Sequence, residues 1–314
     1  MYAKSVRWWQ MAVVILSVSA VSTCYARMPC KEKNAQENSV RQYRHAAEQG
    51  NANAQFNLGL CYYKGQGVEK NLTEAVKWYR RAAEQGNRDA QYNLGVCYDR
   101  GQGVEEDLTE AVKWYRRAAV QGNRDAQFNL GVCYYKGQGV EKNLVEAVKW
   151  YRRAAEQGDT DAQFNLGMCY YEGQGVEKDL TKAVKWFRRA AVQGNANAQF
   201  NLGQCYYEGQ GVEKDLTKAV KWFRRASEQG DARAQFNLGM CYYEGQGIEK
   251  DLAEAVKWFR KAAEHGDAGA QFNLGVCYAN GRGVEKDLAE AAKWFQKAAV
   301  QGNADVHDRR QKER

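Results

Sequence analysis

A period of 36 residues runs through most of the chain and constrains its fold more than any other feature. The 22 residues from Cys169 to Ala190 recur without change from Cys205 to Ala226. A fixed period of this length is typical of a solenoid, in which each unit is too small to bury its own apolar face and stacks on its neighbours. Two residue types keep this spacing through seven copies, at Trp78, Trp114, Trp150, Trp186, Trp222, Trp258 and Trp294, and at Cys61, Cys97, Cys133, Cys169, Cys205, Cys241 and Cys277.

One unit, taken from residues 51–86, begins with an amphipathic helix. Its apolar residues fall on a single stripe, at Ala54, Leu58, Cys61 and Tyr62. Gly65-Gln66-Gly67 then predicts a turn, because glycine adopts positive φ without steric cost.

A second helix follows, with start and stop signals of its own. Asn71 and Glu74 form a capping box, and Gly86 is typical of the residue that follows a helix. The predicted buried stripe is Leu72, Ala75, Val76, Tyr79, Ala82 and Ala83, and the opposite face carries Lys77, Arg80, Arg81 and Glu84. The chain is therefore predicted to be all-α, a solenoid of seven 36-residue helix-turn-helix repeats.

This repeat resembles that of the Sel1-like repeat family, which is similar to the tetratricopeptide repeat but longer by two residues in the glycine turn. The resemblance implies a right-handed α/α superhelix with the first helices lining its concave side. It also implies a non-enzymatic adaptor, since members typically hold protein complexes together and exported bacterial members often engage envelope or host proteins. The positions that carry it recur seven times across about residues 54–302 and are, in the first copy, Ala54, Leu58, Gly59, Tyr62, Gly65, Gly67, Val68, Ala75, Trp78, Tyr79, Ala82, Ala83 and Gly86.

The chain departs from one branch of that family in its cysteines. Some secreted members carry two bridged cysteines in each repeat, whereas each repeat here has one. Binding or hydrolysis of β-lactams, which belongs to that branch, is therefore not carried over. Equivalent positions in stacked helices lie about 8–10 Å apart, too far for a disulfide, so the seven repeat cysteines are predicted to be buried thiols. Cys30 is left over and could pair between chains.

Both ends of the array are predicted to differ from its repeats. Residues 27–38 are expected to be a linker, and residues 39–50 match the end of a second helix and form a half-repeat cap. Seven repeats then run from about residue 51 to residue 302. Residues 303–314 are predicted to be a basic, polar cap or tail, because Asp308 and Arg310 stand where a first helix has Phe and Leu.

The first 26 residues have the pattern of a secretory signal peptide. Lys4 and Arg7 precede an apolar run from Met11 to Val21, which is shorter than the roughly twenty residues that span a bilayer. Cleavage is expected after Ala26, with Ala20 as the second option and acylation at Cys24 as a weaker alternative. The protein is therefore expected in the periplasm or outside a bacterial cell, and removal of this segment lowers the formal net charge from +8 to about +6.

Residues that vary among the seven copies indicate where a partner binds, because stacking does not fix them. We call the residues at one place in successive repeats a column. Aromatic columns are predicted to floor and line a groove on the first helices, with Phe56, Tyr92, Phe128, Phe164, Phe200 and Phe236 in one and Tyr63, Tyr135, Tyr171, Tyr207 and Tyr243 in the other. Alternatively, the phenylalanines pack between neighbouring repeats and leave only the tyrosines exposed.

The column beside the tyrosines changes sign along the array. Its members are Lys64, Arg100 and Lys136, followed by Glu172, Glu208 and Glu244. Such a surface suits a protein or an extended peptide, since rigid aromatic side chains supply much of an interface's energy and a charge gradient sets direction.

Other function classes have less support in the sequence. Histidine occurs only at His45, His265 and His307, which are far apart in a stacked array, so the sequence does not support a histidine-based triad or metal cluster. No metal, cofactor or small-molecule substrate is expected. The recurring basic residues of the second helices form an outer ridge that could meet an anionic envelope polymer or a membrane surface. Nucleic acid is not an expected partner of an exported chain.

Overall fold

The computed structural model describes residues 30–312. The predicted signal peptide, with Cys24 and both candidate cleavage sites, lies outside these residues. No helix in the described part of the chain is both long enough and apolar enough to cross a membrane.

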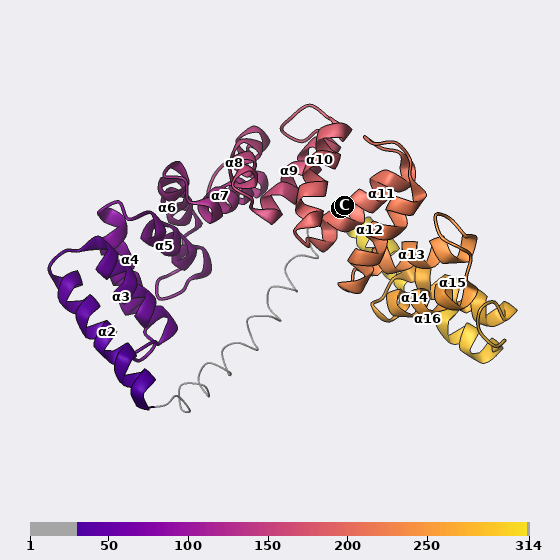
Figure 1. Cartoon of the computed structure of the whole chain (residues 1–314), viewed down its shortest axis with the longest axis horizontal. Coiled ribbons are helices and arrows are strands. Elements are labelled where there is room, and N and C mark those ends of the chain that lie inside the picture. The colour runs from indigo at the N-terminus through magenta and orange to yellow at the C-terminus, as the bar shows by residue number, and fades with distance from the viewer. Residues whose placement is uncertain (1–29, 313–314) are drawn as a thin grey trace. The chain divides into compact units, whose positions relative to one another are not determined.

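Residues 30–312 form fifteen helices and no strand, which confirms the prediction of an all-α repeat array (Figure 1). Two 13-residue helices, close to one another in sequence and antiparallel, make up a typical repeat. The helices are α2 (Cys30–Glu48), α3 (Ala52–Lys64), α4 (Leu72–Glu84), α5 (Arg88–Arg100), α6 (Leu108–Val120), α7 (Arg124–Lys136), α8 (Leu144–Glu156), α9 (Thr160–Glu172), α10 (Leu180–Val192), α11 (Ala196–Glu208), α12 (Leu216–Glu228), α13 (Ala232–Glu244), α14 (Leu252–Glu264), α15 (Ala268–Asn280) and α16 (Leu288–Lys312).

The chain divides into two compact units. The N-terminal unit is Met1–Ala126 with Gln138–Val140, and the C-terminal unit is Gln127–Gly137 with Glu141–Arg314. Within each unit, packing follows chain order: α3 lies against α4 and α4 against α5 in the first, and α9 through α16 each lie against the next in the second.

The predicted cap chemistry is present at both helices of a repeat. Asn51 Oδ1 accepts a hydrogen bond from the backbone N–H of Ala54 at 2.9 Å, and Asn71 Oδ1 accepts one from Glu74 at 3.0 Å. Gly65 ends α3 in the left-handed conformation, with φ of 70°, and its N–H reaches the carbonyl of Cys61. These caps satisfy the backbone groups that a helix leaves unpaired at its ends, so the boundaries of α3 and α4 follow from local sequence.

The core of each repeat lies between its two helices. The second-helix stripe is buried as predicted at Ala75, Val76, Tyr79, Ala82 and Ala83, whereas Leu72 is only half-buried. A glycine allows the two helices to approach closely. In the C-terminal unit, for example, a Cβ added to Gly167 would lie 2.7 Å from the ring of Phe187.

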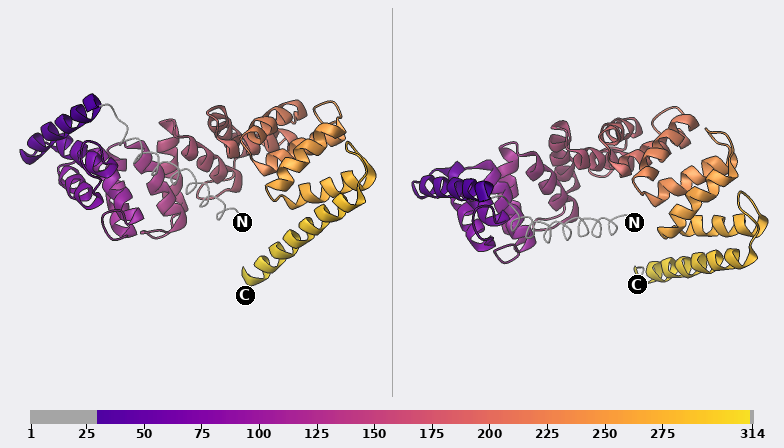
Figure 2. Two further views of the ribbon diagram at one scale, coloured as in Figure 1. Left: turned by 90° about the horizontal axis from the view of Figure 1, so that it is seen from below. Right: turned by 60° about the horizontal axis from the view of Figure 1, so that its bottom comes forward.

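The structure corrects the prediction at both ends of the array. Helix α2 begins at Cys30, so most of the segment predicted as a linker is helical, and residues 30–38 contain neither glycine nor proline to break it. At the other end, α16 runs through Gly302 to Lys312 and so extends past residue 302, the predicted end of the repeats (Figure 2). Gly302 does not end the helix here, because glycine also adopts helical φ and ψ, and a continuous helix keeps its backbone hydrogen bonds.

Candidate partner-binding surface

The surface predicted to bind a partner is built on the first helices of the repeats. We call it the first-helix face and define it by the Phe56, Tyr63 and Lys64 columns. All the members predicted from the sequence lie on α3, α5, α7, α9, α11 and α13. The structure shows that two of these columns also make contacts within the protein, whereas the third is exposed.

The phenylalanine column is half-buried against the repeat that contains it. The ring of Phe164 lies 6.0 Å from that of Phe187, and the ring of Phe200 lies 6.0 Å from that of Phe223, both tilted. Phe56, Tyr92, Phe128 and Phe236 make the same contact with their own second helices at 5.9–6.1 Å. These rings therefore have a packing role within the repeat, and only part of each is open to a partner.

The tyrosine column is half-buried and joins successive repeats. The Tyr63 hydroxyl donates to Gln102 Oε1 at 2.7 Å in the N-terminal unit. In the C-terminal unit the same bond links Tyr135 to Gln174 at 2.8 Å, Tyr171 to Gln210 at 2.6 Å and Tyr207 to Gln246 at 2.5 Å. Arg282 replaces that glutamine in the seventh repeat and donates to Tyr243. Sequence reasoning assigned these tyrosines to the partner alone and missed this contact.

The charged column is exposed throughout. Lys64 and Arg100 end α3 and α5 in the N-terminal unit. In the C-terminal unit Lys136 ends α7, and Glu172, Glu208 and Glu244 end α9, α11 and α13. The pKa of Tyr135 is raised, first by burial and then by the negative charge of Glu172.

A column of asparagines on the same helices went unnoticed in the sequence because it does not vary. Its members are Asn57, Asn93, Asn129, Asn165, Asn201, Asn237 and Asn273, and all are half-buried. In the described part of the chain, the carboxamides of Asn57, Asn93, Asn129 and Asn165 have no hydrogen-bond partner. Each carboxamide can therefore donate one hydrogen bond and accept another, and the backbone of an extended peptide offers a matching carbonyl and N–H. The sequence signal that could have found these asparagines is that all seven repeats have asparagine at this position, although it neither caps a helix nor belongs to the apolar core.

The basic residues of the second helices, by contrast, are engaged by the protein itself. In the first repeat Lys77 Nζ lies 2.6 Å from Glu74 Oε1, Arg80 donates to the Tyr98 hydroxyl, and the Arg81 guanidinium stacks 4.7 Å from the Trp78 ring centroid. The C-terminal unit repeats this pattern, for instance where Arg188 donates to Tyr206 at 2.6 Å and Arg189 lies 4.6 Å from Trp186. The outer ridge is thus a network of internal contacts with its charges partly satisfied.

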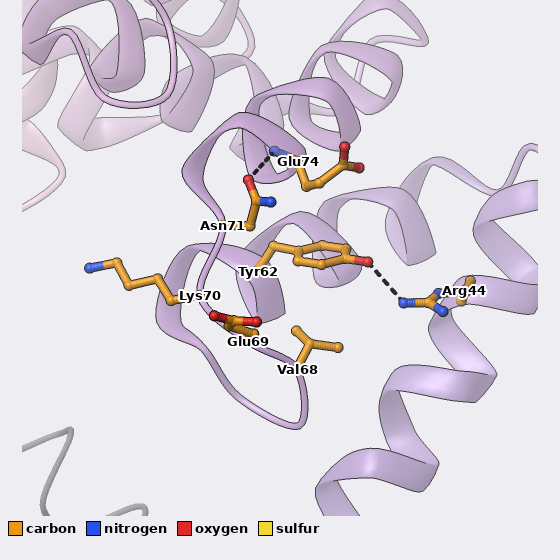
Figure 3. Close-up of a pocket in the computed structure, with 7 residues that line it drawn as sticks. All are labelled: Arg44, Tyr62, Val68, Glu69, Lys70, Asn71 and Glu74. Atoms are coloured by element: carbon orange, nitrogen blue, oxygen red, sulfur yellow. Dashed lines mark hydrogen bonds between the residues drawn. The ribbon is translucent and has the colours of Figure 1, made fainter.

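A polar cavity of about 470 Å³ lies in the N-terminal unit, where the turn after α3 faces α2 (Figure 3). Arg44 donates to the Tyr62 hydroxyl across it at 2.8 Å, and Asn71 on its wall caps α4. Arg80 and Tyr98 make the same contact one repeat later, so the cavity is a product of repeat packing. Ligand pockets are usually lined by apolar and aromatic side chains, and this one is not. Its lining is Arg44, Tyr62, Val68, Glu69, Lys70, Asn71 and Glu74.

The repeat cysteines are free thiols, as predicted. Six are buried, from Cys97 to Cys277, and Cys61 is half-buried. Burial raises the pKa of Cys169 to about 12 and that of Cys97 to about 11, so these thiols stay protonated at neutral pH. Among the residues that the structure describes, no group of three or more His, Cys, Asp or Glu side chains is placed to hold a metal ion.

Comparison with known proteins gives a family and a number of similar solved structures. No curated protein matches the chain. A protective antigen of uropathogenic Escherichia coli strains that displays an SLR fold is 42% identical, with a TM-score of 0.79, and the match covers 85% of this chain and 57% of the antigen. The chain thus spans little more than half the length of that relative. A Sel1 repeat protein from Oxalobacter formigenes is 36% identical, with a TM-score of 0.68, over 88% of this chain and 80% of that one.

The profile of the Sel1 repeat matches seven consecutive segments that agree with the helix pairs described above. They are residues 52–87, 88–123, 124–159, 160–195, 196–231, 232–267 and 268–303. Since these matches follow one another without a gap and cover most of the sequence, the chain belongs to the Sel1 repeat family.

Proposed function

We propose that this chain is an exported scaffold that binds a protein or an extended peptide along its first-helix face, with no catalytic activity of its own. Sel1 repeat proteins are generally protein-interaction scaffolds and typically are not enzymes. The partner, which is an envelope protein or a host protein in this proposal, meets the face that the resemblance places on the concave side of the array.

The observation that carries the proposal is the charged column of the C-terminal unit. Glu172, Glu208 and Glu244 occupy one exposed position in three successive repeats, each as the last residue of its helix. The helix dipole favours cations at that end, so helix stability does not explain the three carboxylates. They support a partner whose segment beside the C-terminal unit is basic.

Two neighbouring columns supply the other parts of a peptide site. The half-exposed asparagine carboxamides can pair with the backbone of an extended chain, which gives affinity without regard to its sequence. The tyrosine rings are held in place by their hydrogen bonds to the glutamine in the turn of the next repeat. A partner that packs on them therefore loses little affinity to the ordering of these side chains. The glutamates of the charged column would then favour peptides with basic side chains.

Charge reversal tests this assignment. Partners are captured from envelope and host extracts with the wild-type chain, identified, and their dissociation constants measured. The double variant Glu172→Lys/Glu244→Lys is expected to weaken binding at least about tenfold, because like charges across an interface are strongly unfavourable. The matched control is Glu156→Lys/Glu228→Lys, which makes the same change at exposed last residues of the second helices α8 and α12 and should alter the constant less than about twofold.

The outcome also separates the two candidate surfaces. If the control, which makes the second helices more basic, tightens binding and the first-helix variant leaves it unchanged, the outer ridge of the second helices is the binding surface, as the envelope-polymer or membrane-surface alternative requires. The internal contacts of Arg80, Arg81 and their equivalents support the first-helix face over that ridge.

Export is tested separately. The basic and apolar pattern of residues 1–26 supports it. Expression in a bacterial host, fractionation and N-terminal sequencing of the mature protein should give a chain that starts at Arg27 and lies in the periplasm or the medium. A chain that keeps Met1 and stays in the cytoplasm would contradict this part of the proposal.

A further inference from the structure

The second helices of two successive repeats, α10 and α12, carry an excess of positive charge. Helix α10 has four basic side chains and no acidic one, and α12 has four basic side chains and one acidic one, Glu228. The second helices on either side of them along the chain, α8 and α14, each have three basic and two acidic side chains. All four helices belong to the C-terminal unit, so the excess marks one part of that unit.

One column of the second helices accounts for most of this difference. Five repeats have glutamate there, and its carboxylate lies 2.5–3.1 Å from the Nζ of the lysine three residues later. In α10 and α12 the column holds Lys182 and Lys218 instead. Each of these two repeats thus has one negative charge fewer and one positive charge more in this column. The five glutamates are Glu74, Glu110, Glu146, Glu254 and Glu290.

The exchange leaves two lysines without the partner that their equivalents have. Lys185 and Lys221, three residues after the column, are exposed, and neither makes an ion pair or a hydrogen bond within the described part of the chain. Lys182 pairs instead with the cap residue Asp179 at 2.9 Å, and Lys218 pairs with the cap of its own helix. The internal contacts of the outer ridge are therefore incomplete in these two repeats.

Cations from the two repeats also approach one another. Arg188 of α10 donates to the Tyr206 hydroxyl at 2.6 Å, and Lys218 Nζ, at the start of α12, lies 5.5 Å from the centroid of the same ring. Pairing with Asp215 raises the pKa of Lys218, and the positive charge of Arg188 opposes that rise. Two like charges thus lie beside one tyrosine, where a bound anion would offset their repulsion.

Helix stability does not explain the two lysines of the column. Lys182 and Lys218 stand in the first turn of their helices, where the helix dipole favours an anion such as the glutamate of the other repeats. We propose that α10 and α12 form a second binding surface, distinct from the first-helix face, which takes an acidic segment of another protein. We call it the second-helix patch and define it by Lys182, Lys185, Arg188, Lys218 and Lys221.

The other repeats indicate which anion fits this patch. In them a carboxylate of the chain itself lies beside the lysine, as Glu146 lies 3.1 Å from Lys149. A glutamate or aspartate of a partner would supply the same group to Lys185 and Lys221, in a charge-assisted hydrogen bond. Because one exposed ion pair contributes little, the surface depends on several cations that act together.

The edges of the patch favour a short acidic segment over a bilayer or a long polyanion. Glu146 and Glu156 on α8, and Glu254 and Glu264 on α14, are half-buried or exposed. An anionic membrane or a long phosphate polymer that reached beyond α10 and α12 would meet these carboxylates. A segment with a few acidic side chains would not, and the scaffold could then hold an acidic partner here and a basic one on its first-helix face.

Binding of a short synthetic peptide that alternates glutamate and glycine tests the proposal. Fluorescence anisotropy measures its dissociation constant for the full chain, beside that of a peptide with glutamine in place of each glutamate. The wild-type chain should bind the glutamate peptide at least about tenfold more tightly. Lys182→Glu/Lys218→Glu should weaken this binding at least about tenfold. The variant gives both repeats the residue that five others have, so its thermal unfolding should occur no lower than that of the wild type.

The matched control is Lys113→Glu/Lys293→Glu, which changes the net charge by the same amount on the second helices α6 and α16. It should alter the dissociation constant less than about twofold. Lys185→Gln/Lys221→Gln removes only the two unpaired cations and should weaken binding at least about threefold. Glu172→Lys/Glu244→Lys, which tests the first-helix face, should not weaken binding of the acidic peptide, so the two proposed surfaces can fail separately.

Four results would overturn the proposal. The first is equal affinity for the glutamate and glutamine peptides, and the second is an equal loss in the patch variant and its control. The third is tighter binding of inorganic polyphosphate or of phosphatidylglycerol vesicles that Lys182→Glu/Lys218→Glu removes, since the patch would then take phosphate groups. The fourth is self-association by light scattering that the same variant removes, since the occupant would then be a second copy of the chain.

Discussion

The Tyr171 hydroxyl donates to Gln210 Oε1 at 2.6 Å, across the boundary between two repeats. Tyr171 stands near the end of α9, and Gln210 lies in the Gly-Gln-Gly turn of the following repeat. The bond connects the end of the first helix of one repeat, α9, to the turn that follows the first helix of the next repeat, α11. A residue predicted to serve a partner therefore also holds the array together.

Tyr171→Phe should lower the free energy of unfolding of the chain by about 0.5–1.5 kcal/mol, the usual net contribution of one hydrogen bond. The ring stays, so its contact with Phe187 at 6.2 Å is kept. Urea denaturation followed by circular dichroism measures the change.

The matched control is a double-mutant cycle with Gln210→Ala. If the two residues act through their bond, the double variant should be less destabilised than the sum of the single ones. Strict additivity would show that the bond contributes nothing to stability.

Local sequence was sufficient to predict the helices of one repeat. Asn51 and Asn71 cap their helices, and Gly65 ends one, through contacts no more than four residues away in the chain. The buried stripes follow from the helical period, which a single repeat shows in full. Repetition then gave the fold class, because the same hairpin must pack on its neighbours in every copy.

Contacts between repeats could not be predicted in the same way. Tyr171 and Gln210 are 39 residues apart, and Arg188 and Tyr206 are 18 apart, so neither bond is visible in the pattern of one helix. In the sequence, binding residues were sought among the positions that differ between repeats. This criterion excluded the asparagine column of Asn165, because it is the same in all seven repeats. The path of the chain beyond Gly302 depends on a balance between a turn and a longer helix, which local signals do not decide.

Two glycines with positive φ should respond differently to alanine. Gly158→Ala places a Cβ in open space at φ of 90°, and the left-handed backbone alone should cost about 1–2 kcal/mol. Gly175→Ala has the same kind of backbone at φ of 68°, but its Cβ would lie 2.1 Å from the Leu144 carbonyl oxygen of the preceding repeat. We expect about 1–3 kcal/mol of further destabilisation from that clash, measured by urea denaturation. Equal losses would mean that the Gly175 turn can move away from Leu144.

The buried thiols should make stability fall at alkaline pH. Burial raises the pKa of Cys169 and Cys205 from 9.0 to about 12 in the folded chain. Below pH 9 both states keep the proton, so the folded state has its full advantage there. Between about pH 9 and pH 12 the unfolded thiols ionise first, and the free energy of unfolding should fall as pH rises. Chemical denaturation at pH 8.0, 9.0 and 10.0 measures this slope.

The control for the alkaline effect is Cys169→Ala/Cys205→Ala. This variant should be less stable at pH 8 because it leaves cavities, but its stability should fall less steeply between pH 8 and pH 10. An unchanged slope would assign the alkaline loss to lysine and tyrosine side chains.

Reversing the charge of Glu172 should stabilise the fold while it weakens partner binding. Glu172 is the last residue of α9, where the helix dipole favours a cation, so Glu172→Lys should raise the free energy of unfolding by about 0.3–1 kcal/mol at low ionic strength. Glu156→Lys at the end of α8 should do the same, and Lys136→Glu at the end of α7 should have the opposite sign. Most of each change should disappear at 1 M salt, because screening acts within about 3 Å there. A loss of stability in Glu172→Lys would show that this carboxylate supports the fold, and reduced binding by that variant could then no longer be read as loss of a contact with the partner.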